Sequence, residues 1–199
     1  MEYDLGRTPV VLLAGGKSSR MGQPKGLVAF QGRPWLETQL SRLAGLGVRE
    51  TIIVLGYQAE LYIPTLSKLQ MKDVHIQSVL NPLPEFGPFT SVQAGGKRAL
   101  QMPICAAWIL PIDVPCPSRE VWQRLSASSA TVCVPTHGAR GGHPVRISKE
   151  FLIHLLEVPA DGPDSRLDRQ IRLAGQAVEY VEVADPSVLK NLNSLSDWQ

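Results

Sequence analysis

A glycine-rich loop with basic side chains follows the first apolar run of the chain, and these residue types bind phosphate. Arg20 and Lys25 supply two positive charges in this loop. Glycines let backbone N–H groups approach an anion closely, and guanidinium and ammonium groups neutralise phosphate oxygens. The loop begins with Leu13, Ala14, Gly15 and Gly16. This combination predicts a triphosphate site in which the backbone of these four residues contacts a nucleotide.

Two common phosphate-binding loops do not fit this segment. A P-loop ending at Lys17 and Ser18 would need glycine where Val11 stands. A dinucleotide-binding G-x-G-x-x-G needs a spacing that Gly15 and Gly22 do not have. The alternative that remains beside nucleotide binding is a glycine-rich turn whose basic side chains are only solvated.

A carboxylate, Asp113, follows the apolar run of residues 104–112. An aspartate after a strand is often a helix cap or a turn residue, although Ser118 is the better cap here. Nucleotidyl transfer needs Mg²⁺ to neutralise the triphosphate, and Mg²⁺ usually takes one or two protein carboxylates. We therefore expect Asp113 to bind Mg²⁺.

The elements that must position these residues alternate between strands and helices. Short apolar or β-branched runs predict strands at residues 9–14, 51–55, 74–80, 104–112, 131–135, 143–147 and 178–183. Helical patterns cover residues 32–47, 59–69, 88–100, 118–126 and 165–173, with one more helix after Ser148. This alternation predicts a three-layer α/β/α, Rossmann-like fold with a mostly parallel sheet. Ligands should then bind beyond the carboxyl ends of the strands.

Composition indicates one domain over residues 1–199, with 44% hydrophobic and 19% charged residues. The net charge of +2 gives no argument for a nucleic-acid or membrane partner. No apolar run is long enough for a signal peptide or a transmembrane helix. Three cysteines without C-x-x-C spacing favour a reduced, cytoplasmic protein.

The first loop also carries a resemblance to a known family. Residues 13–25 read L-A-G-G-K-S-S-R-M-G-Q-P-K. This segment resembles the signature L-A-G-G-x-S-x-R-M-G-x-x-K of the MobA-like guanylyl- and cytidylyltransferases that build the dinucleotide form of molybdenum cofactor. The resemblance implies a nucleoside-diphosphate-sugar-pyrophosphorylase-like fold and transfer of a nucleotide to molybdopterin with release of pyrophosphate. Arg20 and Lys25 would then hold the phosphates and stabilise the charge on pyrophosphate.

Two further segments resemble motifs that bind the metal in this family. Residues 110–115, L-P-I-D-V-P, match the L-P-x-D-x-P motif, which implies that Asp113 binds Mg²⁺. The end of the chain resembles N-x-N-T-P-x-D, with Ser194 for threonine and Leu195 for proline. Asn191 and Asn193 would complete or brace the metal site, because amide oxygens are hard ligands. The alternative is an ordinary asparagine-rich turn.

Nucleotide and acceptor recognition involve residues at other strand ends. Gly56 and Asn81 lie at the predicted ligand edge, and we expect both to contact the nucleotide. In the family, L-A-G-G accompanies guanylyl transfer, which favours GTP, whereas residues 141–145, G-G-H-P-V, resemble the cytidylyl branch. His143 is a candidate for the acceptor pocket, and its alternative is a hydrogen-bonded structural histidine. Arg166 and Arg169 fit a solvated helix face better than an anion site.

Three functional alternatives stay open from the sequence. The chain could be a cytidylyltransferase for molybdopterin, or a nucleotidyltransferase for a sugar or alditol phosphate, because the fold serves all of these. It could also be a nucleotide-binding regulator without catalysis, although such a protein would not need Asp113. The family resemblance further implies a molybdoenzyme or its chaperone as the partner that receives the product, but no residues identify that surface.

Overall fold

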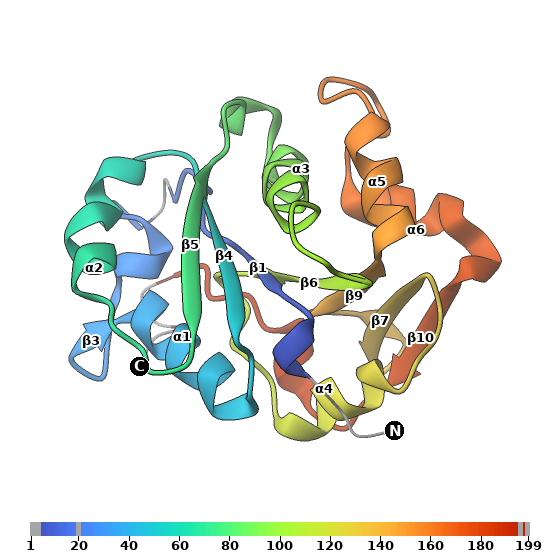
Figure 1. Cartoon of the computed structure of the whole chain (residues 1–199), viewed down its shortest axis with the longest axis horizontal. Helices are drawn as coiled ribbons and strands as arrows, with labels where there is room; N and C mark the ends of the chain where they lie inside the picture. Colours follow the sequence, from blue (N-terminus) through green and yellow to red (C-terminus); the bar gives the residue numbers. More distant parts are fainter. Residues whose placement is uncertain (1–4, 19–20, 195–196, 198–199) are drawn as a thin grey trace.

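The centre of the molecule is one mixed, mostly parallel sheet, seen in a computed structural model that describes residues 5–18, 21–194 and 197 (Figure 1). The strand order is β10-β7-β9-β6-β1-β4-β5, and β8 pairs with β7. The bounds are β1 (Val10–Leu13), β4 (Glu50–Leu55), β5 (His75–Leu80), β6 (Ala106–Pro111), β7 (Val132–His137), β8 (Arg140–Gly141), β9 (Val145–Ser148) and β10 (Val178–Glu182). All seven predicted strands are therefore present.

One strand of the main path runs against its neighbours. β9 is antiparallel to both β6 and β7, whereas β1, β4, β5 and β6 are parallel to one another. The reason is the tight turn at Gly138 and Ala139, which have φ values of 57° and 63° and send the chain back along β7. The apolar run of residues 143–147 predicted a strand but contained no information on its direction.

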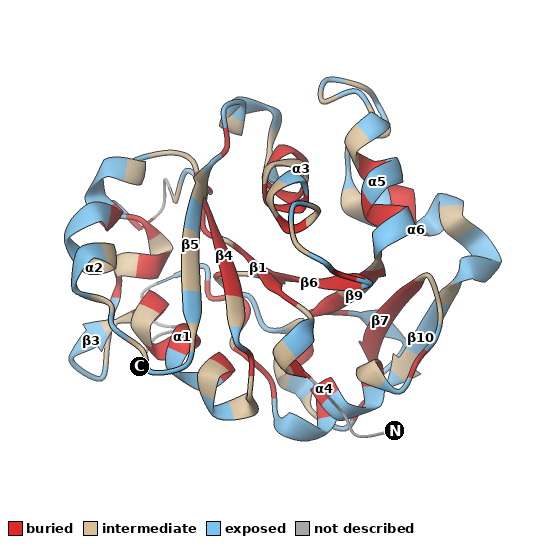
Figure 2. Ribbon diagram, in the orientation of Figure 1, coloured by how far each residue is buried: buried red, intermediate tan, exposed pale blue. Residues whose placement is uncertain are grey.

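Helices cover both faces of the sheet, as the strand–helix alternation predicts (Figures 1 and 2). One face carries α1 (Trp35–Leu46) and α4 (Arg119–Ser126), with α2 (Ile63–Lys68) beside them. The other face carries α3 (Pro88–Ala99), α5 (Lys149–Glu157) and α6 (Leu167–Ala174). Alternate residues of β1 point to opposite layers, so that Val10 and Leu12 pack with α1 and Val11 packs with α3. The expected three-layer α/β/α fold is confirmed.

Three helix starts show how the residues before each helix contribute to its boundary. The helix expected from residue 32 begins only at Trp35, because β2 (Ala29–Phe30) and β3 (Arg33–Pro34) form a small hairpin. Ser148 caps α5 as predicted: its Oγ accepts a 3.2 Å hydrogen bond from the backbone N–H of Phe151. Ser118 precedes α4, and its own backbone N–H donates to Asp185 at 2.8 Å.

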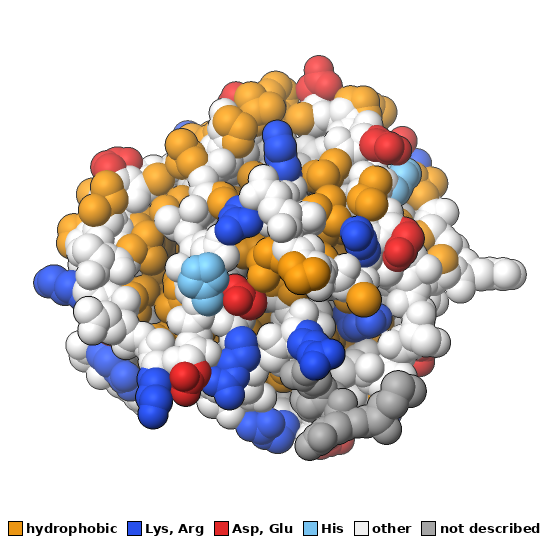
Figure 3. Space-filling model, in the orientation of Figure 1, with side chains coloured by type: hydrophobic (Ala, Val, Ile, Leu, Met, Phe, Trp, Pro, Cys, Tyr) orange, Lys and Arg blue, Asp and Glu red, His pale blue; other side chains and the backbone are white. Residues whose placement is uncertain are grey.

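The buried core fixes the edge of the sheet at which the polar residues meet. Trp35, Trp108 and Trp122 are fully buried, as expected from their apolar surroundings. The carboxyl ends of β1, β4 and β6 lie side by side, so the loops that follow them share one edge. On the face drawn in Figure 3, basic and acidic side chains are interspersed among apolar ones. None of the described helices has the length and apolar character needed to cross a membrane.

Candidate active site

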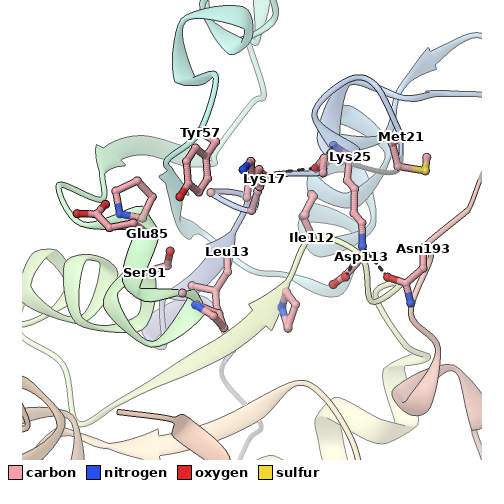
Figure 4. Close-up of a pocket in the computed structure, with 18 residues that line it drawn as sticks. Leu13, Lys17, Met21, Lys25, Tyr57, Glu85, Ser91, Ile112, Asp113 and Asn193 are labelled. Atoms are coloured by element: carbon pink, nitrogen blue, oxygen red, sulfur yellow. Dashed lines mark hydrogen bonds and ion pairs between the residues drawn. The ribbon is translucent and has the colours of Figure 1, made fainter. Parts of the chain in front are cut away.

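A cavity of about 560 Å³ opens at the carboxyl edge of the sheet (Figure 4). Its walls come from the loop after β1, the turn after β4, the start of α3, the end of β6 and the C-terminal tail. Of the residues expected at a nucleotide, this cavity is lined by Leu13, Ala14, Gly15, Gly16, Lys25 and Asp113. The structure therefore brings most of the predicted nucleotide site together in one hollow.

The first loop is held in place by a backbone contact between two glycines. A Cβ atom on Gly56 would lie 2.6 Å from the carbonyl oxygen of Gly15, and one on Gly15 would lie 3.0 Å from the Gly56 nitrogen. The next residue, Tyr57, donates its backbone N–H to the same Gly15 oxygen at 3.2 Å. Gly56 thus supports the loop from behind and is not among the residues that line the cavity, and its expected contact with the nucleotide stays a prediction.

Two side chains of this cavity, Lys17 and Tyr57, were not expected from the sequence motifs. The Lys17 ammonium lies 6.0 Å from the centre of the Tyr57 ring, and both side chains line the hollow on the side away from Asp113 (Figure 4). Tyr57 follows β4 almost directly, so its position at the ligand edge of a parallel sheet was the available signal. An aromatic ring here offers a surface for stacking a nucleobase.

Lys25, Asp113 and Asn193 meet at one point of the cavity (Figure 4). The Lys25 ammonium donates to Asp113 Oδ2 at 2.7 Å and to Asn193 Oδ1 at 2.8 Å. Lys25 begins the short 3-10 helix η2 (Lys25–Leu27), Asp113 follows β6, and Asn193 belongs to the tail. The Lys25 and Asp113 side chains are 16% and 24% exposed, so their ion pair is only partly screened by water.

The backbone around Asp113 is fixed from three sides. The N–H of Ile112 donates to Leu13 at 2.9 Å, and the indole of Trp35 donates to the carbonyl of Ile112 at 2.6 Å. From the tail, the N–H of Leu192 donates to the carbonyl of Asp113 at 2.8 Å. These bonds leave the Asp113 carboxylate at a defined position between the core and the cavity.

The tail is anchored by Asp197, which positions Asn193. Asp197 Oδ2 accepts from the N–H groups of Asn193 and Ser194 at 2.8 Å each, and from the Ser194 hydroxyl at 2.9 Å. These backbone and side-chain bonds lower the pKa of Asp197. Ser194 therefore supplies the hydroxyl even though it replaces the threonine of the resembled motif. Leu195 lies outside the described residues.

The other tail asparagine is placed differently. Asn191 lines a second cavity, and its side-chain amide donates to the Leu189 carbonyl at 3.4 Å. In the first cavity, Asp113 Oδ2 and Asn193 Oδ1 both accept hydrogen bonds from the Lys25 ammonium. No group of three or more His, Cys, Asp or Glu side chains with metal-site geometry occurs in the described part of the chain. A hard cation that keeps water and phosphate ligands fits such a sparse donor set.

Asn81 is buried and held by hydrogen bonds within the protein, and the contact with the nucleotide expected for it stays a prediction. Its side chain is buried, and its amide donates to the hydroxyls of Thr90 at 2.9 Å and Ser91 at 3.0 Å. Its carbonyl oxygen accepts from the Leu83 N–H at 3.0 Å. Asn81 thereby fixes the start of α3, from which Ser91 reaches the cavity wall. Arg20 lies outside the described residues, and its phosphate-binding role stays a prediction.

A second cavity of about 850 Å³ adjoins the first. The two hollows share Leu13, Pro88, Pro111 and Asp113 in their walls. Apolar side chains make up much of the second one: Phe86, Phe89, Val92, Val134, Val145, Leu167 and Ile171. Because Asp113 belongs to both cavities, a group bound in one can meet a group bound in the other beside its carboxylate.

His143 lines the second cavity, as the acceptor-side expectation required. Burial lowers the pKa of its imidazole below the ordinary value of 6.5, although the Ile109 backbone and the Asp113 charge oppose this shift. Its buried Nδ1 atom has no hydrogen-bond partner among the described residues.

The arginines at α6 are solvated, and two of them also form part of the wall of the second cavity. Arg166 and Arg172 both pair with Asp168 at 3.0 Å, and all three line the second cavity. Arg169 pairs instead with Asp164 at 2.9 Å. The side chains of these arginines are half exposed or more, which agrees with the solvated face that the sequence favoured. The placement of Arg166 and Arg172 in the cavity wall was not expected.

A family model and two relatives match most of the chain. The model of the MobA-like NTP transferase domain matches residues 10–177. A molybdenum cofactor guanylyltransferase from Xanthomonas euvesicatoria is 33% identical over 189 residues, which cover 94% of this chain and 90% of that relative. A molybdenum cofactor cytidylyltransferase from Escherichia coli is 25% identical, with 94% of this chain and 92% of that relative covered.

Solved structures share the fold at lower identity. The molybdopterin-guanine dinucleotide biosynthesis protein A from Archaeoglobus fulgidus superposes with a TM-score of 0.70 at 17% identity, covering 96% of this chain and 95% of that one. A Mycobacterium tuberculosis protein, Rv0371C, in complex with manganese superposes with a TM-score of 0.64 at 18% identity, covering 88% of this chain and 87% of that one. These likenesses support the nucleotidyltransferase fold.

Proposed function

Because the chain belongs to the MobA-like NTP transferase family, we propose that it transfers GMP from GTP to the phosphate of molybdopterin and releases pyrophosphate. The observation that carries this proposal is the position of Asp113, which lines both the loop-bounded cavity and the larger apolar cavity. A nucleotide in the first and an acceptor in the second would bring their phosphates together at this carboxylate.

The first cavity would bind the triphosphate nucleotide. Its loop offers backbone N–H groups, and Lys17 and Lys25 lie on either side of the hollow. GTP is favoured because the loop has glycine at position 15, as in the guanylyl branch, and because a guanylyltransferase is the relative that shares 33% identity. CTP is the second candidate, supported by the G-G-H-P-V segment and by the cytidylyltransferase relative.

The reaction would be a direct displacement at phosphorus. An oxygen of the acceptor phosphate attacks the α-phosphorus of GTP, and the bond to the bridging oxygen breaks so that pyrophosphate leaves with its electron pair. Asp113 and Asn193 would hold a divalent cation, for which we propose Mg²⁺; when bound, it neutralises the triphosphate. Lys25 would stabilise the charge that grows on pyrophosphate. The backbone of the first loop orients the nucleotide, so catalysis rests on alignment and charge neutralisation.

The second cavity supports a bulky acceptor with an apolar body. Its volume of about 850 Å³ and its apolar walls, which include Phe86 and Phe89, suit a fused heterocycle. A small sugar or alditol phosphate would leave much of this surface in contact with water. Arg166 and Arg172 add donors for the polar edges of such an acceptor.

The cellular setting of this activity follows from the same proposal. All three cysteines are free thiols, and burial raises the pKa of Cys116 to about 12, which makes it unreactive. This chemistry supports work in a reducing compartment, for which we propose the cytoplasm. The product would pass to a molybdoenzyme or its chaperone.

Binding of the four common nucleoside triphosphates, with and without Mg²⁺, tests the proposed nucleotide. We expect GTP to bind more tightly than CTP, ATP and UTP, and Mg²⁺ to strengthen its binding. A preference for CTP would move the assignment to cytidylyl transfer. The absence of binding to any of the four would contradict the proposed activity.

A further inference from the structure

The Lys25 ammonium lies between the two oxygens that we propose as metal ligands. It lies within 2.8 Å of Asp113 Oδ2 and Asn193 Oδ1, the two oxygens that converge in this part of the cavity. A lysine ammonium and a divalent cation both seek hard oxygen ligands, and each carries positive charge in a small volume. Both cannot occupy the same position between these two oxygens.

The backbone that carries each of the two oxygens is anchored, whereas the ammonium lies at the end of a long side chain. Asp113 is held through its carbonyl by Leu192, and Asn193 is held through its N–H by Asp197. The backbone of Lys25 is also anchored, because its N–H donates to the Ser18 hydroxyl at 3.2 Å. Its four-carbon side chain remains the flexible part of the cluster. Displacement of the ammonium therefore needs no change in the fold.

We propose that Lys25 is a tethered cation that holds the two metal-ligating oxygens until the phosphates of a bound nucleotide draw it away. This inference rests on the proposed function, because it takes the nucleotide cavity to be the triphosphate site. The phosphates supply a second anion within the same cavity, so the ammonium can leave the partly buried carboxylate for it. The vacated oxygens are then free to ligate the metal.

Metal and nucleotide binding are coupled in this arrangement. The nucleotide releases the metal ligands, and the metal in turn keeps Lys25 on the phosphates, so each strengthens the binding of the other by the same factor. Without nucleotide the site is neutralised by its own lysine and binds a divalent cation weakly. The coupling keeps the metal ligands paired until the substrate is present.

The affinity of the full chain for Mn²⁺ alone tests the inference without nucleotide or acceptor. Free Mn²⁺ is measured by electron paramagnetic resonance. Lys25→Met should bind Mn²⁺ about tenfold more tightly than the wild type, the size of an ordinary coupling between sites. Lys17→Met is the matched control, because Lys17 lines the same cavity but contacts the Tyr57 ring. Lys17→Met should show a clearly smaller gain in Mn²⁺ affinity than Lys25→Met. Adding Asp113→Asn to Lys25→Met should remove the gain.

Each other outcome contradicts the inference. Equal or weaker Mn²⁺ binding by Lys25→Met would mean that the ammonium does not compete with the metal. The same gain in Lys17→Met would indicate a general effect of charge. If circular dichroism shows that Lys25→Met is unfolded, Lys25→Gln carries the same test. Because this assay contains no nucleotide, failure of the wild type to bind GTP would reject the proposed function without changing the Mn²⁺ result.

Discussion

The indole nitrogen of Trp35 donates a 2.6 Å hydrogen bond to the carbonyl oxygen of Ile112, the residue directly before Asp113. Trp35 is the first residue of α1 and is almost completely buried, with 1% of its surface exposed. The bond therefore connects the apolar core to the backbone that carries the proposed metal ligand. A substitution that disturbs the core at Trp35 should therefore also affect the active site.

Trp35→Phe should lower both stability and turnover. The substitution leaves the buried Ile112 carbonyl without its indole donor, which costs about 1–3 kcal/mol. Trp108→Phe is the matched control, because Trp108 is equally buried and its indole nitrogen has no hydrogen-bond partner in the described part of the chain. Urea unfolding and kcat of both variants check this. Equal losses in the two variants would show that the Ile112 bond has no special role.

Gly56→Ala should disturb the nucleotide loop from behind. The new Cβ would lie 2.6 Å from the Gly15 carbonyl oxygen, so one of the two backbone segments must shift, at a cost of about 1–3 kcal/mol. We expect weaker nucleotide binding together with lower stability. Gly45→Ala in α1 is the control, since its Cβ would meet nothing within 4 Å. Unchanged nucleotide affinity in Gly56→Ala would argue against the support role of this contact.

The sequence was most informative where function depends on one continuous segment. The first loop and Asp113 each follow a buried strand, so their meeting at one edge follows from the parallel sheet. Asn193 was expected there only from the resemblance of the tail to a family motif, because the Leu192 to Asp113 hydrogen bond that brings the tail back to β6 is a long-range contact. Asn81 shows the converse, because its amide at the ligand edge forms hydrogen bonds with the following turn and with the start of α3.

Arg166→Ala should raise the KM for the acceptor and leave GTP affinity unchanged. Arg166 lines the second cavity, which the nucleotide does not fill in the proposed arrangement. Arg169→Ala removes a comparable exposed ion pair, with Asp164, outside that cavity and serves as the control. Steady-state kinetics with molybdopterin as the varied substrate separates the two. An equal KM for molybdopterin in both variants would show that Arg166 does not contribute to acceptor binding.

The stability of the protein should fall on acidification in a way that depends on His143. Burial lowers the pKa of this imidazole below its ordinary value of 6.5, so around and below that pH the unfolded chain binds a proton that the folded chain does not. The free energy of unfolding should therefore decrease as the pH is lowered through 6.5. His143→Gln should flatten this slope in urea unfolding from about pH 8 to about pH 5. If the unfolding free energy of His143→Gln depends on pH as steeply as that of the wild type, the prediction is wrong.

Pyrophosphate release in a mixture of GTP, molybdopterin and Mg²⁺ tests the central claim most directly, with the wild type and Asp113→Ala compared side by side. Asp113 lines both cavities, so its loss should abolish turnover while the first loop still binds GTP. We predict release by the wild type that requires molybdopterin, and none by Asp113→Ala. Equal release by the two proteins, or no release by the wild type with any nucleoside triphosphate, would contradict the account.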